Sequence, residues 1–222
     1  MNSYPIELEI SGSTAMWTRP DTGDCPVSYP APTYSAVKGV FESILWGPAV
    51  GIVPTKVEIC APIEYHNYQT NYGGPLRKSS IVATGGGFQL LATVLIDVCY
   101  RFYADVAPVA PETKARITEG ARSWDKKTTS PGHAYQDIFD RRIKRGQSFC
   151  IPFLGWKEFG PSYFGRFRDE TKIETTINMT IPSLLREVFS DGYASESRFT
   201  FDQNVAITNG VMQFPRRGDA NA

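Results

Sequence analysis

The chain opens with a segment in which apolar and polar residues alternate. Ile6, Leu8 and Ile10 are apolar, and glutamates stand between them. A period of two residues predicts a strand over 4–11 with one buried face.

A helix follows a long loop. Four prolines within 18–32 predict an extended loop, and the residues after it repeat apolar side chains at helical spacing as far as Leu45. Gly47 and Pro48 would end this helix.

The remaining elements are predicted from the same kinds of pattern. They are strands at 52–64, 90–106 and 148–159, a projecting hairpin or loop at 66–88, a polar connector from Pro108 to Pro131, a basic helix from Tyr135 to Gly146, a helix near 182–190, and short strands at 173–181, 197–207 and 211–214. The order strand, helix, strand, strand, helix, strand is the ferredoxin-like arrangement, which RNA-recognition domains share with many unrelated proteins. We therefore expect an α+β fold.

Composition limits the protein class. The 222 residues are 41% hydrophobic and 13% aromatic, which suits one large domain or a domain with an elaboration and argues against disorder. No apolar run reaches the roughly 18 residues of a membrane span, and the first residues lack the basic leader and apolar core of a secretory signal. The four cysteines have no CxxC spacing, which argues against a zinc ribbon or a disulfide framework. We expect a cytoplasmic protein whose cysteines are reduced and which does not associate with a membrane.

The net charge of zero conceals an uneven distribution. Residues 112–146 hold nine Lys or Arg against five Asp or Glu, whereas 1–111 hold six against nine and 147–222 hold eight against nine. One short central segment therefore carries the positive excess, a pattern that allows one face to bind phosphates.

Several stretches, in order, resemble a known family. They are a strand ending in Gly12, AMWTRP at 15–20, SYPAPTYSAVKGVFESILWGP at 28–48, KVEICAPI at 56–63, DIFDRRIKRGQSF at 137–149, PFLGWKEF at 152–159 and NGVMQFP at 209–215. This series resembles the Cas-five family of CRISPR-associated proteins, closest to the type I-C form. Only 66–88 and 160–200 look divergent.

The resemblance implies an architecture and a role. It implies a ferredoxin-like (RRM-like) domain over 1–159 with a thumb hairpin at about 66–90, and a β-rich C-terminal extension over 160–222. The family caps the backbone of Cascade, the antiviral effector complex, and holds the 5′ handle of CRISPR RNA. The expected partners are therefore CRISPR RNA, the Cas-seven backbone subunit, the large Cas-eight subunit and, through the complex, target DNA.

An enzymatic alternative comes from the same resemblance. Type I-C members are metal-independent endoribonucleases that process precursor CRISPR RNA, with a Tyr in the first helix and a Lys-His pair before the second. Those positions are Leu45, Ala134 and Tyr135 here. Catalysis would need His133, Tyr135 or a nearby Lys in an altered arrangement, although His133 equally suits an ordinary loop histidine. His66 is interpreted as a solvated residue, and we expect neither a metal site nor a cofactor.

The basic helix supplies four candidate RNA contacts. Its cations would lie along RNA phosphates, because Arg and Lys are the usual phosphate ligands. The alternative is a solvated helix face with ion pairs between Asp137 and Arg141 and between Asp140 and Lys144. The four candidates are Arg141, Arg142, Lys144 and Arg145.

Five further residues are candidate RNA contacts. Tyr34 suits base stacking or the core, and Lys38 suits a phosphate contact or an ion pair with Glu42. The others are Arg19, in the loop after the first strand, and Arg77 and Lys78, at the thumb tip.

Other conspicuous residues have simpler interpretations. Trp17, Trp156 and Phe159 are expected in the core, and Gly85–Gly87 as a hinge, since no GK[ST] follows. A domain that makes protein contacts only is the alternative from a different functional class.

Overall fold

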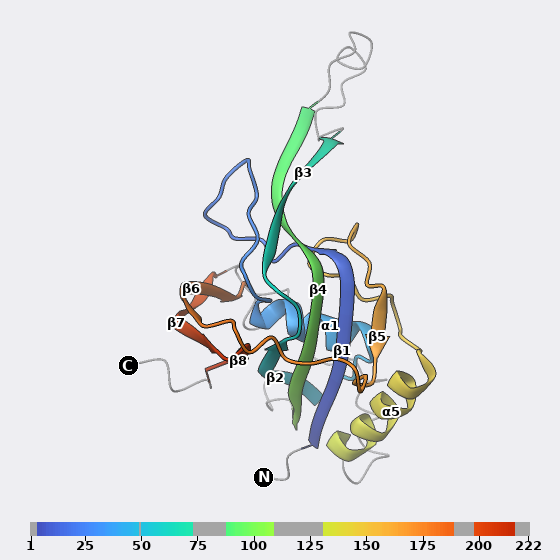
Figure 1. Ribbon diagram of the computed structural model, residues 1–222. Helices are drawn as coiled ribbons and strands as arrows, with labels where there is room; N and C mark the ends of the chain where they lie inside the picture. The colour runs from blue at the N-terminus through green and yellow to red at the C-terminus, as the bar shows by residue number, and fades with distance from the viewer. Residues whose placement is uncertain (1–3, 49, 73–87, 109–130, 189–197, 216–222) are drawn as a thin grey trace.

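The fold is organised by β4 (Phe88–Pro108), a strand of 21 residues that pairs with three others in the computed structural model (Figure 1). The structure describes residues 4–48, 50–72, 88–108, 131–188 and 198–215. Its strands form a curled antiparallel sheet in the order β5-β1-β4-β2-β8-β7-β6, with β3 also beside β4. The other elements are β1 (Tyr4–Ala15), α1 (Tyr34–Ile44), β2 (Val50–Ile59), β3 (Glu64–Tyr72), α5 (Pro131–Arg145), β5 (Tyr163–Gly165), β6 (Met179–Glu187), β7 (Thr200–Thr208) and β8 (Val211–Gln213).

The partners of β4 change along its length. Phe102, in the second half, lies opposite Leu8 of β1 and Val57 of β2. The first half pairs with β3 as far as Glu64 and Ile96. The β3–β4 pair therefore extends beyond the rest of the sheet (Figure 1).

One face of the sheet is apolar and packs on the two helices. The strand predicted at 4–11 is confirmed as part of β1, and its apolar residues Ile6, Leu8 and Ile10 are all buried, although Glu9 on the other face is buried too. Phe41 of α1 and Phe139 of α5 meet over this face with ring centroids 5.6 Å apart. Sheet and helices thus share one core.

The opposite face of β1 carries a buried carboxylate. Glu9 has no solvent exposure, and it accepts hydrogen bonds from the main-chain N–H and Nε of Arg168 (3.0 and 2.5 Å), from the Thr171 hydroxyl (2.7 Å) and from Nε of Arg101 (3.4 Å). Burial alone would raise the pKa of Glu9, but these donors and the Arg168 charge outweigh it, so the pKa is lowered. The network fastens the segment after β5 to the sheet.

A buried ion pair joins the C-terminal strands to the start of α1. Arg186 of β6 donates to both carboxylate oxygens of Asp202 on β7 (2.9 and 3.0 Å) and to the carbonyl of Pro215 (3.0 Å). Its guanidinium lies 4.2 Å from the ring centroid of Tyr34. Burial raises the pKa of Asp202, although Arg186 opposes this. The β6–β7 pair is thereby held beside α1.

The strand predicted at 148–159 is wrong. The N–H groups of Phe149 and Cys150 donate instead to carbonyls in the last turn of α1, which have no partner within the helix. Gly155 has a φ of 91°, and a Cβ there would lie 1.8 Å from the carbonyl oxygen of Met16. These long-range backbone contacts, not strand pairing, satisfy the segment, and the short β5 pairs with β1 instead.

The helix predicted near 182–190 is also wrong in its described part, which belongs to β6. This strand pairs with β7 and buries Ile181 and Leu184, so tertiary pairing outweighs the local pattern. The strand predicted at 173–181 begins only at Met179.

The other predicted elements are present with shifted ends, as α1, β2, β4, α5, β7 and β8. The predicted hairpin at 66–88 is described only in part, since 73–87 lie outside the described residues, as do 109–130 of the polar connector. None of the described helices is long and apolar enough to span a membrane. The four cysteines are free thiols.

Candidate RNA-binding surface

The structure divides the four cations of α5 into two kinds. Arg142 turns inward, and its guanidinium donates a hydrogen bond to the main-chain carbonyl of Ile44 at the end of α1. Arg141, Lys144 and Arg145 are exposed. They lie near the C-terminal end of the helix, where positive charge is favoured by the helix dipole.

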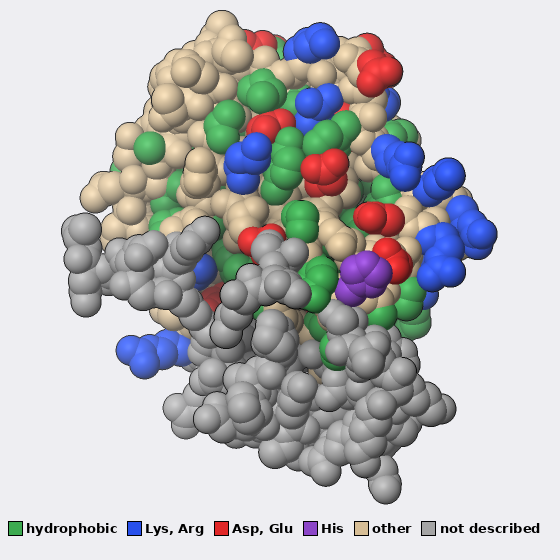
Figure 2. All heavy atoms as spheres, turned by 90° about the horizontal axis from the view of Figure 1, so that it is seen from below, with side chains coloured by type: hydrophobic (Ala, Val, Ile, Leu, Met, Phe, Trp, Pro, Cys, Tyr) green, Lys and Arg blue, Asp and Glu red, His purple; other side chains and the backbone are tan. Residues whose placement is uncertain are grey.

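The ion pairs that would neutralise the exposed cations do not form. Asp137 lies beside His133 instead, with Oδ2 3.4 Å from Nδ1. Burial raises the pKa of Asp140, and the cation whose charge opposes this is Arg166. Within the described chain the three exposed cations therefore have no ion-pair partner. Figure 2 shows Lys and Arg side chains gathered on the side of the molecule where α5 lies.

Two positions that the resemblance associates with catalysis meet in space. The hydroxyl of Tyr135 donates a hydrogen bond to the carbonyl of Leu45, and burial raises the pKa of Tyr135. Its ring lies nearly parallel to that of Phe139, with centroids 6.3 Å apart. A buried phenol that is held in this way stabilises the α1–α5 contact, and neither Leu45 nor Ala134 carries a titratable side chain.

His133 is an exposed histidine of this region. It lies in the first turn of α5, with its ring edge-on to that of Tyr4 at a centroid distance of 6.2 Å. Asp137, one turn further along, can hold the orientation of the imidazole. The sequence interpretation paired Asp137 with Arg141 instead, although its i,i+4 spacing from His133 was an equally available signal.

The structure favours the simpler interpretations of the α1 residues. Tyr34 is buried, with Phe214 edge-on to its ring at 5.4 Å and Arg186 over it. The Nζ atom of Lys38 lies 3.8 Å from Oε1 of Glu42, in the expected i,i+4 ion pair. Burial raises the pKa of that carboxyl.

Arg19 lies in the loop after β1, away from α5 in the sequence. It forms an ion pair with Asp21 at 2.7 Å and stands 5.8 Å from the ring centroid of Tyr29. Trp17 is buried as expected, and its indole N–H donates to the hydroxyl of Tyr100 at 3.2 Å.

A family comparison covers almost the whole chain. A family model described as CRISPR-associated protein (Cas_Cas5), in its Cas5d form, matches residues 6–215. The chain belongs to the Cas5 family, in its type I-C form. It is 30% identical to the CRISPR pre-crRNA endoribonuclease Cas5d of Mannheimia succiniciproducens over 95% of this chain and 94% of that protein. It is 28% identical to the protein of the same name from Thermus thermophilus over 72% of this chain and 62% of that one.

Solved structures share the Cas5 chain's fold. A CRISPR-associated protein (18% identity) and a functionally uncharacterized Streptococcus mutans protein (17%) each superpose with a TM-score of 0.69 over 99% of this chain and 96% of theirs. A chain of a CRISPR RNA-guided surveillance complex (15%) gives 0.50 over 97% and 92%.

The remaining candidates of this Cas5 protein lie elsewhere. Arg77, Lys78 and Gly85–Gly87 fall outside the described residues. His66 is exposed on β3. Two aromatic residues expected in the core, Phe159, which is buried, and Trp156, which is half-buried, stack with centroids 5.7 Å apart.

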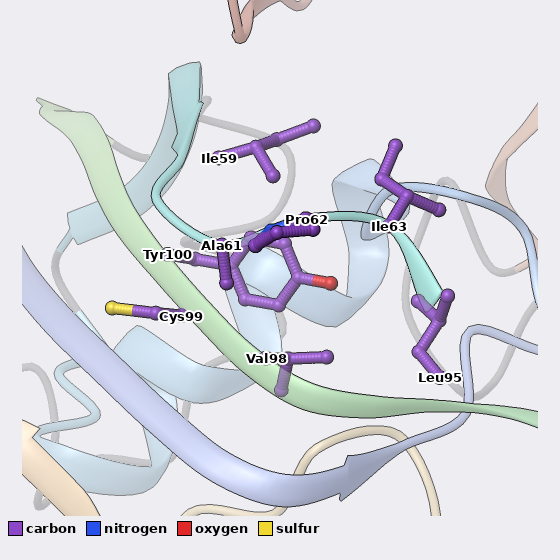
Figure 3. A pocket seen from close by; sticks show the side chains of 8 residues that line it. All are labelled: Ile59, Ala61, Pro62, Ile63, Leu95, Val98, Cys99 and Tyr100. Carbon is purple, nitrogen blue, oxygen red and sulfur yellow. The ribbon is translucent and has the colours of Figure 1, made fainter. Parts of the chain in front are cut away.

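A shallow apolar pocket lies where the chain passes from β2 to β3 and crosses β4 (Figure 3). It holds about 180 Å³, including space open to solvent. The Cys99 thiol points away from it (Figure 3). The pocket is lined by Ile59, Ala61, Pro62, Ile63, Leu95, Val98, Cys99 and Tyr100. It offers no charged group, so the surface at α5 is the better candidate for binding RNA.

Among the described residues, no three His, Cys, Asp or Glu side chains lie close enough to hold a metal ion.

Proposed function

We propose that this Cas5 protein is a subunit of a type I CRISPR Cascade effector, where it binds the 5′ handle of CRISPR RNA and caps the backbone in antiviral defence. The observation that carries the proposal is the family match over residues 6–215. The fold shared with a chain of a CRISPR RNA-guided surveillance complex supports it.

Among the candidate RNA contacts, the three exposed cations of α5 are the best supported as phosphate ligands. Arg141, Lys144 and Arg145 are solvent-facing and have no competing carboxylate within the described chain. Charge of this kind binds an RNA backbone and makes the affinity depend on salt. Arg19, Tyr34, Lys38, Arg77, Lys78 and Arg142 remain predicted contacts, with Arg142 and Tyr34 the least accessible.

The finer architecture belongs to the same proposal. The strand order β5-β1-β4-β2, with α1 between β1 and β2 and α5 before β5, supports a ferredoxin-like domain. The β3–β4 pair supports a thumb at about 66–90. The division into 1–159 and 160–222, the cytoplasmic location and the contacts with Cas-seven and Cas-eight subunits remain predictions.

A second candidate function is metal-independent cleavage of precursor CRISPR RNA. The Mannheimia relative bears the name CRISPR pre-crRNA endoribonuclease, and His133 and Asp137 form an exposed imidazole–carboxylate pair. In this alternative His133 accepts the proton of the attacking 2′-hydroxyl while Asp137 orients its ring. Tyr135 is too buried to share that role.

One experiment separates the two functions. The protein is incubated with 5′-labelled precursor repeat RNA in EDTA, and the products are resolved on denaturing and native gels. Intact RNA with a salt-sensitive mobility shift supports handle binding alone. A single cut that His133→Ala abolishes, while the matched control His66→Ala retains it, establishes the endoribonuclease. No mobility shift and no cut, alone or with the other proteins of its locus, contradicts both functions.

A further inference from the structure

Two aromatic side chains beside the basic helix are unusually exposed. Trp46 follows α1 and is 63% exposed, and Phe149 follows α5 and is 79% exposed. Neither ring contacts another aromatic ring among the described residues. Large apolar side chains in such positions mark interaction sites when they lie together.

Backbone contacts bring the two residues into one region. The N–H of Phe149 donates to the carbonyl of Ile44 at 3.2 Å, two residues before Trp46. Arg142 of α5 donates to the same carbonyl. The end of α1, the end of α5 and the chain after α5 therefore meet at Ile44.

The backbone on both sides of Trp46 is held by one core residue. The Tyr135 hydroxyl bonds the carbonyl of Leu45, and a Cβ at Gly47 would lie 3.3 Å from the Tyr135 ring. The indole thus projects from a fixed turn. A ring whose backbone is already ordered loses little further entropy when a ligand stacks on it.

We infer that Trp46 and Phe149, the Trp46–Phe149 surface, stack on unpaired bases of the RNA whose phosphates the exposed α5 cations contact. This inference rests on the proposed RNA-binding function. Single-stranded RNA is commonly bound by cations along its backbone together with aromatic rings for its bases. The three exposed cations of α5 have no ion-pair partner within the described chain, and Tyr34, the ring that the sequence suggested for stacking, is buried.

A protein partner is the competing occupant of this surface. Ile151 and Phe153 are also exposed nearby in the sequence, and an aliphatic side chain offers no stacking face to a base. The adjacent unpaired cations favour RNA, because their charge is complementary to phosphate. If RNA occupies the surface, removing a ring weakens RNA binding. If a protein occupies it, removing a ring weakens assembly and leaves RNA binding unchanged.

The test compares two RNA probes. The full-length protein is titrated with its repeat RNA and with the same RNA carrying abasic sites in the 5′ handle. Trp46→Ala and Phe149→Ala are each expected to weaken binding of the intact RNA at least fivefold and to leave the salt slope unchanged, because stacking releases no counterions. For the abasic RNA, wild type and variants should bind alike. Phe199→Ala, which removes an exposed ring at the start of β7, is the matched control and should change nothing.

Each other outcome overturns the inference. If both variants bind the RNA as tightly as the wild type, the two rings do not stack on bases, and the proposed function is unaffected. Variants that bind RNA normally but fail to join the complex assembled from the other proteins of its locus identify a protein-docking site. A wild-type chain that binds repeat RNA neither alone nor in that complex overturns the proposed function as well. Unchanged thermal unfolding of both variants shows that they fold.

Discussion

The hydroxyl of Tyr135 donates its hydrogen bond to the carbonyl of Leu45, across 90 positions of the chain. The family resemblance places catalytic groups at both positions, so the two helices bring the expected site together. In this chain the Tyr135 side chain is buried and Leu45 is half-buried. The hydrogen bond joins α5 to the end of α1.

Tyr135→Phe should therefore lower the free energy of unfolding by about 1 to 2 kcal/mol, since it leaves the partly buried Leu45 carbonyl without its donor. Chemical denaturation measures the change. Tyr65→Phe, at an exposed tyrosine of β3, is the control and should change little. Unchanged stability combined with lost RNA cleavage would show instead that the Tyr135 hydroxyl takes part in chemistry.

Periodic patterns predict most of the helices and strands correctly, because the spacing of apolar residues within such an element indicates both its type and its buried apolar face. The alternation around Leu8 predicts β1 for this reason. Segment 148–159 was mistaken because the donors of Phe149 and Cys150 are satisfied by α1, more than 100 residues earlier. No local pattern contains that information.

The candidate site shows the same limit. The cations of α5 were visible in the sequence, but their division into one inward and three outward side chains depends on the position of Ile44. Likewise the sequence suggests Tyr34 for stacking, and no sequence pattern singles out Trp46, which follows α1. Only the packing of Arg186 and Phe214 on Tyr34 distinguishes them.

Glu9→Gln should make the protein less stable at neutral pH by about 3 kcal/mol, because it removes the charge that Arg168 and Arg101 surround. The pKa of Glu9 is lower in the folded state than its ordinary value of 4.5. The stabilisation is therefore complete above pH 4.5 and declines as the pH falls through the folded-state pKa.

Denaturation of wild type and Glu9→Gln from pH 7 to pH 3 checks the sign. The difference between them should narrow only below about pH 4.5. Comparing the pair cancels the opposite contribution of Asp202, whose raised pKa favours folding in acid. Glu7→Gln, at an exposed position of the same strand, is the control, and a gap that stays constant across this range contradicts the argument.

Arg186→Met should destabilise the protein by about 3 to 5 kcal/mol, because it leaves the carboxylate of Asp202 buried without its partner. Asp202→Asn alone should also destabilise. The double variant should lose less than the sum of the two, since neither half then leaves an uncompensated charge. Additive losses in thermal unfolding would show that the ion pair contributes no coupling between β6 and β7.

Charge reversal at Arg141, Lys144 or Arg145 should weaken binding of repeat RNA and reduce the slope of log affinity against log salt by about 0.7 for each lost phosphate contact. The loss of affinity should not depend on the RNA sequence, because every RNA carries the same phosphates. Lys157→Glu, an exposed cation outside α5, is the matched control and should leave the slope unchanged. Each reversal should lower the free energy of unfolding by no more than about 1 kcal/mol, because the three side chains are exposed and unpaired within the described chain and lose only their favourable interaction with the helix dipole. If all three reversals leave guide-RNA retention and the slope intact, α5 does not contact the RNA, and a role in protein contacts alone becomes the better account of its charge.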